Sequence, residues 1–232
     1  MKAPPVQIPT LVLLTLLMLP SGWYALDFGQ GGLRDSLPEP HYIHSENHSA
    51  NTAIFSHMLT GAAITLLAPL QLIRPLRNRF PDLHRWTGRL LICGAVITAL
   101  GGLIYIAERR TIGGWPMDVG FTIYGLLLLI AAVQTFRHAQ ARRIARHHVW
   151  ALRFFWLAIA SWLYRVHYGL WYLVTGGLWS NPDFTGAFDL VQNVAFYLPY
   201  LIGVEIWLRR KRPPLPVGPF HRQISVPVCR HD

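Results

Sequence analysis

Six long apolar stretches constrain the fold of this chain more than any other feature of its sequence. A helix that crosses the hydrocarbon core of a bilayer needs about 20 consecutive, mostly apolar residues. Stretches of this kind lie at about 8–26, 52–73, 87–107, 118–136, 149–175 and 189–208. The chain is 52% hydrophobic and only 14% charged, whereas soluble domains carry about 25% charged residues. The sequence therefore predicts an all-α, polytopic membrane bundle of six transmembrane helices within residues 1–212.

Prolines in the second and sixth stretches are expected to kink the helices there, and the first stretch resembles a signal peptide. Pro69 and Pro199 lie within the second and sixth stretches, and they are expected to kink the helices because proline has no backbone N–H. The first stretch has one lysine, an apolar core and Ala25 as a cleavage residue, but Trp23 stands where a small residue is needed. We therefore expect a retained first helix, with cleavage as the alternative.

The basic residues are distributed unequally between the two sides of the predicted membrane. If the N-terminus is cytoplasmic, 17 of the 21 Lys and Arg residues lie on the inner side, and only Arg34, Arg109 and Arg110 lie outside. Cytoplasmic loops carry such an excess, so both termini are expected to be cytoplasmic. The same distribution explains the net charge of +10, and it predicts contact with anionic lipid headgroups rather than with nucleic acid. The Pro-rich tail at 213–232 is expected to be a disordered cytoplasmic segment.

One pattern of residues occurs twice, each time at the cytoplasmic start of an outward-running helix. "PDLHRWTGRLL" at 81–91 contains His84, Trp86 and Arg89, and "RHHVWALRFF" at 146–155 repeats the spacing with His148, Trp150 and Arg153. Tryptophan is enriched at membrane interfaces, and arginine near a helix end can extend to the headgroups. The repeat is therefore consistent with two interfacial anchors.

Interfacial anchoring does not require histidine, so a binding site is the second interpretation. The positive end of the helix dipole disfavours imidazolium, and neutral imidazole is the form that binds metals. His84 and either His147 or His148 are expected at one depth, where they could bind a b-type haem or a transition metal ion. Arg89 and Arg153 would then meet propionates or another anion. An anionic lipid or a quinone headgroup is the alternative occupant.

A second level of candidate residues is expected nearer the outer face. His57 and His167 lie at this level, and ionisable residues inside a membrane are candidates for function. Gly61 follows His57 by one helical turn, as Gly88 follows His84, so each glycine leaves room for a flat macrocycle or allows close helix packing. Histidine pairs at two levels resemble di-haem b-type membrane cytochromes in a general way.

Arg165 lies in the apolar segment "SWLYRVHYGLWY" and is expected to have a partner. An arginine inside the bilayer needs a counter-charge or a wet cavity. Asp118, Asp189 or an anionic ligand could supply that charge.

Residues of about 52–170 resemble the bacterial membrane family called domain of unknown function 2306. The resemblance rests on "SHMLTGAAITLLAPLQLIRPLRNRFPDLHRWTGRL" and "ARHHVWALRFFWLAIASWLYR". The family pattern corresponds here to His57, Gly61, Pro81, His84, Arg85, Trp86, Gly88, Arg89, His147, Trp150, Arg153 and Arg165. The second segment departs from the pattern, with His148 and Val149 where the family has arginines, which leaves open whether His147 or His148 is the working histidine. The resemblance implies a multi-pass protein of the bacterial inner membrane, and it implies no reaction.

Three functions remain open from the sequence. The candidate residues suit a histidine-ligated haem b or metal protein of membrane electron transfer, with His57, His84, His147, His148 and His167 as ligands and Arg89, Arg153 and Arg165 as anion partners. The alternatives are a carrier of a small solute, an anion or a proton, and a non-catalytic assembly component of a membrane complex. The sequence does not decide between a monomer, a homo-oligomer and a larger membrane complex.

Overall fold

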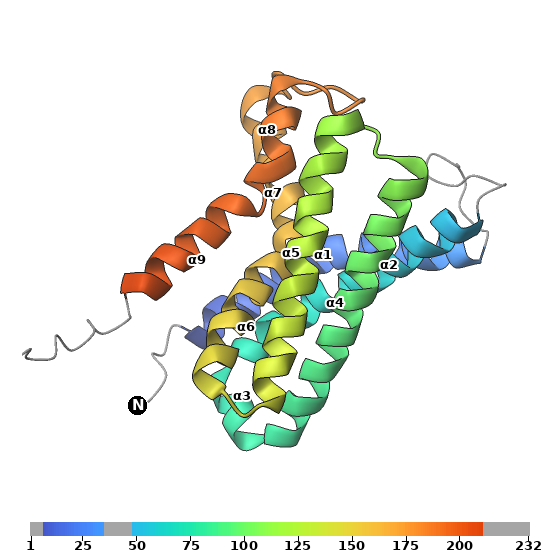
Figure 1. The fold of residues 1–232 in the computed structure, drawn as a ribbon. Coiled ribbons are helices and arrows are strands. Elements are labelled where there is room, and N and C mark those ends of the chain that lie inside the picture. The colour runs from blue at the N-terminus through green and yellow to red at the C-terminus, as the bar shows by residue number, and fades with distance from the viewer. Residues whose placement is uncertain (1–6, 35–47, 211–232) are drawn as a thin grey trace, which may run out of the picture.

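The computed structural model describes residues 7–34 and 48–210, and within these ranges it contains helices and no strand. The predicted all-α fold class is therefore confirmed, while the tail at 213–232 lies outside the described residues. The elements, drawn in Figure 1, are α1 (Gln7–Leu33), α2 (His48–Leu67), the 3₁₀ helix η1 (Pro69–Leu72), α3 (Arg74–Arg79), α4 (Pro81–Arg109), α5 (Gly114–Gln140), α6 (Ile144–Ala158), α7 (Ala160–Thr175), α8 (Ala187–Ala195) and α9 (Leu198–Arg210).

Five helical segments of the described chain are long and apolar enough to cross a membrane. They are Pro9–Leu33, His48–Leu72, Pro81–Arg109, Gly114–Gln140 and Ala187–Arg210, and each contains or overlaps one of the predicted stretches. The stretch predicted at 149–175 is not one continuous helix, because α6 ends at Ala158 and α7 begins at Ala160, with 15 and 16 residues respectively. The count of six spans therefore remains a prediction from the sequence.

The interruption between α6 and α7 lies at Ile159, where two backbone carbonyls bond to side chains of other helices. The hydroxyl of Tyr124 on α5 donates to the carbonyl of Leu157 at 2.8 Å, and the hydroxyl of Thr65 on α2 donates to the carbonyl of Ala158 at 3.1 Å. Backbone groups inside a bilayer need such internal partners. The two bonds explain why an interruption is tolerated here, and they attach the α6–α7 pair to α5 and α2.

The two predicted proline kinks correspond to interruptions in the structure. α2 ends at Leu67, and Pro69 begins the 3₁₀ helix that follows it. The last predicted span is divided into α8 and α9, and Pro199 is the second residue of α9. In the first turn of a helix the backbone N–H groups have no partner within the helix, so a proline there costs no hydrogen bond. In Figure 1, α9 is directed away from α8, and it packs against α6.

Small residues form the buried interfaces between the long helices. Ala95 and Ala99 of α4 are buried, as are Ala131 and Ala132 of α5, and such residues let helix backbones approach closely in a membrane. α2 packs against α1 and α4, and α5 packs against α4, α6 and α8. Large apolar side chains such as Leu173 and Val174 are instead exposed, as expected for a surface that faces lipid.

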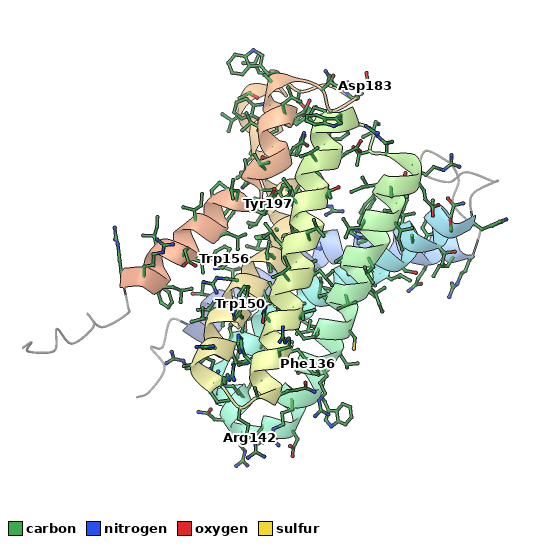
Figure 2. The ribbon with its side chains drawn as sticks, in the orientation of Figure 1. Phe136, Arg142, Trp150, Trp156, Asp183 and Tyr197 are labelled. Carbon is green, nitrogen blue, oxygen red and sulfur yellow. The ribbon has the colours of Figure 1, made fainter. Side chains whose placement is uncertain are left out.

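Charged residues are segregated between the two ends of the bundle. α3 lies at the lower end in Figure 1, where Figure 2 also labels Arg142, and Figure 2 labels Asp183 at the opposite end. The lower end carries most of the predicted inner basic residues, including Arg74, Arg77, Arg79, Arg85, Arg142, Arg143 and Arg146. The structure is therefore compatible with the predicted charge asymmetry, and the cytoplasmic location of this end and of the termini stays a prediction.

Candidate functional site

The two repeated segments adopt the same local arrangement at the starts of α4 and α6. The guanidinium carbon of Arg89 lies 4.9 Å from the ring centre of Trp86, and that of Arg153 lies 4.6 Å from the ring centre of Trp150 (labelled in Figure 2). Arginine and tryptophan three residues apart lie on one face of a helix, where a cation over an aromatic ring is attracted by its quadrupole. This stacking accounts for the tryptophan and arginine of both segments without any ligand.

The histidines of the two segments lie near one another. The imidazole of His84 is within electrostatic range of Arg77, His147 and His148. The rings of His147 and His148 have their centres 5.8 Å apart. The structure thus brings the three predicted metal-ligand histidines to one end of the bundle, which we call the inner histidine cluster (His84, His147 and His148).

His147 has one ring nitrogen fixed by the backbone of α5. Its Nδ1 lies 3.0 Å from the main-chain oxygen of Thr135, and a carbonyl can only accept, so Nδ1 carries the proton. In the neutral ring, Nε2 then bears a lone pair, and this is how metal-ligating histidines are commonly oriented. Partial desolvation lowers the pKa of the neighbouring His148, and the charges of His147, Arg77 and Arg74 lower it further.

The inner histidine cluster does not form a metal-binding group by itself. No three His, Cys, Asp or Glu side chains among residues 7–34 and 48–210 are placed to hold one metal ion. The charged groups that act on His84 and His148 are other histidines and arginines, with no carboxylate among them. This basic environment, which contains no carboxylate, favours the binding of an anion over the binding of a bare divalent cation.

Arg153 has a carboxylate partner that the sequence did not indicate. Its Nη2 donates to Glu205 of α9 at 2.6 Å, and Glu205 also accepts a longer hydrogen bond, of 3.4 Å, from Arg209. Arg153 had been expected to meet propionates, but its charge is balanced within the protein. Arg89 has no carboxylate partner among the described residues, and its side chain is exposed.

The outer-level histidine His57 is held against the backbone of α4. Its Nδ1 donates to the main-chain oxygen of Thr98 at 2.7 Å. The space beside Gly61 is occupied by Thr98, whose methyl carbon would lie 3.6 Å from an added Cβ. Of the two interpretations of Gly61, the structure shows close helix packing.

His167 has hydrogen-bond partners at both ring nitrogens. Nε2 lies 2.7 Å from the hydroxyl of Tyr200, and Nδ1 lies 3.0 Å from the side-chain nitrogen of Gln192. A metal or haem iron could bind this histidine only after one of these hydrogen bonds had been broken. In this arrangement both ring nitrogens of His167 and Nδ1 of His57 are engaged by the protein, and the pair stays a prediction from the sequence.

A family model described as a predicted membrane protein, DUF2306, matches residues 54–208. The chain belongs to this family. The expected family resemblance is thus confirmed, and the match extends beyond residue 170, through the end of α7 and α8 and into α9 as far as residue 208. No curated protein and no solved structure matches the chain.

The region matched by the family model, residues 54–208, contains every candidate site residue named from the sequence, from His57 to His167, whereas α1 precedes it. It also contains partners that sequence reasoning missed, namely Thr98, Thr135 and Glu205. The two threonines act through their backbone oxygens, so no side-chain pattern could have shown them. Glu205 is an acidic residue in an apolar segment of the sequence, and this feature could have indicated that it has a partner.

Proposed function

We propose that this DUF2306 protein binds an anionic cofactor at the inner histidine cluster, and that a b-type haem for membrane electron transfer fits the donor set best. The observation that supports the proposal is the bond between His147 Nδ1 and the Thr135 carbonyl, which leaves Nε2 as a lone-pair donor beside His84 and His148. One or two axial imidazoles suffice for a haem iron. When bound, a b-type haem would supply a centre that accepts and releases one electron.

The surrounding charge supports a haem more than a bare metal ion. Arg77 and Arg74 lie within electrostatic range of His148, and they could bind the propionates of a haem through charge-assisted hydrogen bonds. The same two cations would repel a divalent ion, which would also lack a third protein ligand among the described residues. In this proposal Arg77 and Arg74 take the role that had been expected of Arg153.

Purification of the full-length protein tests the proposal directly. Haem absorbs strongly in the visible region. We expect the purified protein to show a haem spectrum that corresponds to about one haem per protein chain. His147→Ala should remove most of this absorption. His148→Ala is the matched control at the neighbouring residue, and it should leave the absorption unchanged unless His148 is the ligand instead of His147. A colourless protein that also lacks stoichiometric metal would contradict the proposal.

A carrier of an anion or proton is the second candidate, and one observation favours it. Arg165 of α7 forms no ion pair with a carboxylate of the described residues. A cation of this kind inside a membrane marks an anion or proton pathway in many transport proteins. A colourless protein whose Arg165→Gln variant fails to move a charged solute in proteoliposomes would support this candidate.

A further inference from the structure

Arg165 lies where α1, α2, α5 and α7 come together, in the part of the bundle away from the inner histidine cluster. The ring of Tyr24 on α1 has its centre 5.9 Å from the guanidinium carbon. Tyr124 of α5, Tyr164 of α7 and His57 of α2 are within electrostatic range of the same group. At 1.5 Å per residue, Arg165 is about 15 Å below the outer end of α7 at Thr175. The guanidinium is therefore deep in the bilayer if α7 crosses it.

The protein uses only part of the hydrogen-bonding capacity of Arg165. A guanidinium has five N–H donors in a planar fork. Within the described residues, Nη1 donates to the main-chain oxygen of Ser161 at 2.9 Å, and the other nitrogens form no hydrogen bond. The residue is only partly buried, and none of these nitrogens is among the fully enclosed polar atoms that lack a partner. The unused N–H donors of the guanidinium are thus available to an oxyanion.

Both carboxylates that the sequence suggested as partners of Arg165 are engaged elsewhere. Asp118 pairs with Arg110 at 2.6 Å and also accepts hydrogen bonds from Thr111. Asp189 accepts hydrogen bonds from Tyr168, Ser180 and two backbone amides. An arginine inside a bilayer is costly without a counter-charge, and no carboxylate of the described residues pairs with Arg165.

The side of the site formed by Tyr24 lies at the exposed surface of the bundle, which faces lipid if α1 crosses the membrane. Tyr24 is 53% exposed although it belongs to an apolar helix, and its neighbour Trp23 is 73% exposed. One further contact joins α1 to α7 nearby, from Trp162 Nε1 to the main-chain oxygen of Leu17 at 3.2 Å. An amphiphile within the bilayer could therefore reach Arg165 past Tyr24 without crossing the packed helices.

From this arrangement we infer that Arg165 binds the oxyanion headgroup of a membrane amphiphile, a carboxylate or a phosphate, at a site between α1 and α7. The guanidinium fork matches two oxygens of either group. The ring of Tyr24 lies on one side of the guanidinium and attracts its positive charge. The site is separate from the inner histidine cluster and needs no haem, so it stands or falls independently of the proposed function.

Binding of oleate to the full-length protein in nanodiscs tests the inference, with methyl oleate as the matched neutral ligand and dioleoyl phosphatidate as the phosphate ligand. We expect oleate, phosphatidate or both to bind the native protein more tightly than the methyl ester. Acetate distinguishes the route of access, because a small carboxylate that binds as well as oleate would mean entry from water. Arg165→Gln should weaken binding of the anionic amphiphile at least about tenfold, since charge-assisted hydrogen bonds contribute about 1.5–3 kcal/mol.

Arg165→Lys and Arg209→Gln complete the experiment. The lysine variant keeps the charge without the planar fork, so it should retain a weaker preference for the anionic ligand even if the glutamine variant does not fold. Arg209 is an exposed arginine on α9, and its replacement should not change binding. Equal binding of oleate and its methyl ester, with no preference for phosphatidate, would overturn the inference. So would anion binding that is unchanged in both Arg165 variants.

Discussion

The imidazole of His57 is joined to the backbone of α4 by a hydrogen bond from its Nδ1 to the carbonyl of Thr98, 2.7 Å long. A second contact, 2.7 Å between the hydroxyl oxygens of Thr60 and Thr98, lies one turn along α2. Gly101 and Gly102 make this approach possible, because an added Cβ on Gly101 would lie 2.5 Å from the Ala53 carbonyl oxygen. An intramembrane histidine that indicated a ligand site from the sequence thus serves here to hold two helices together.

Gly101→Val should destabilise the protein through this interface. The valine side chain would clash with the backbone carbonyl of Ala53 on α2. A backbone atom cannot move aside as the end of a flexible side chain can, so α2 and α4 must move apart. Overpacking of this kind costs about 1–3 kcal/mol, and we expect a lower melting temperature in detergent. Gly203→Val on α9 is the matched control, since nothing lies within 4 Å of an added Cβ there. Equal stability of the two variants would contradict the observed packing.

Asp189→Asn should loosen the connection between α7 and α8. Oδ2 of Asp189 accepts from the backbone amides of Asn181 and Gly186, at 3.1 and 3.0 Å, and Oδ1 accepts from the hydroxyls of Tyr168 and Ser180. In the asparagine variant, an amide nitrogen replaces either Oδ1 or Oδ2. This nitrogen cannot accept hydrogen bonds, so the two hydrogen bonds to the oxygen that it replaces are lost. Hydrogen bonds to a charged group contribute about 1.5–3 kcal/mol each.

Limited proteolysis of the segment at 176–186, together with the melting temperature, measures the effect of Asp189→Asn. Asp183→Asn is the control, because Asp183 is exposed on the same connection (Figure 2). Cleavage at the same rate in both variants would show that Asp189 does not organise this segment.

Arg153 and Glu205 should behave as a coupled pair that attaches α9 to α6. Their side chains are 21% and 33% exposed, so the pair is partly shielded from solvent, and we expect a coupling free energy of about 1 kcal/mol. A double-mutant cycle with Arg153→Gln and Glu205→Gln, read from stability in detergent, measures this value. A parallel cycle with Arg209→Gln should show a smaller coupling, since Arg209 is 74% exposed and lies 3.4 Å from Glu205.

The charge asymmetry predicts that the end of the bundle with Arg142 is cytoplasmic. Reporter fusions at residue 45 and at the C-terminus should therefore report opposite sides of the membrane. A fusion at Arg142, between α5 and α6, should report the same side as the C-terminus. Fusions at residue 45 and the C-terminus that report one side would show that the number of crossings between them is even, and the predicted topology would be wrong.

The all-α fold, five candidate membrane spans and the segregation of basic residues could be predicted from the sequence alone. Each of these features depends on composition along a short segment, because one helix must present an apolar surface about as long as the bilayer is thick. Family membership was recognisable for the same reason, since the spacing of His84, Trp86 and Arg89 is a local pattern. The stacking of arginine on tryptophan in both repeated segments is also local, and it follows from helix geometry.

Only the tertiary structure decided which polar side chains contact residues of other helices. Thr98, Thr135 and Glu205 are 41, 12 and 52 residues from the side chains that they bind, so their partnership depends on which helices are neighbours. The interruption at Ile159 likewise depends on Tyr124 and Thr65, which lie on other helices and bond to the carbonyls beside it. Apolar length determines that a helix enters the membrane, but the packing of small residues determines which faces meet. That packing pairs Arg153 with Glu205 and leaves Arg165 without a carboxylate among the described residues.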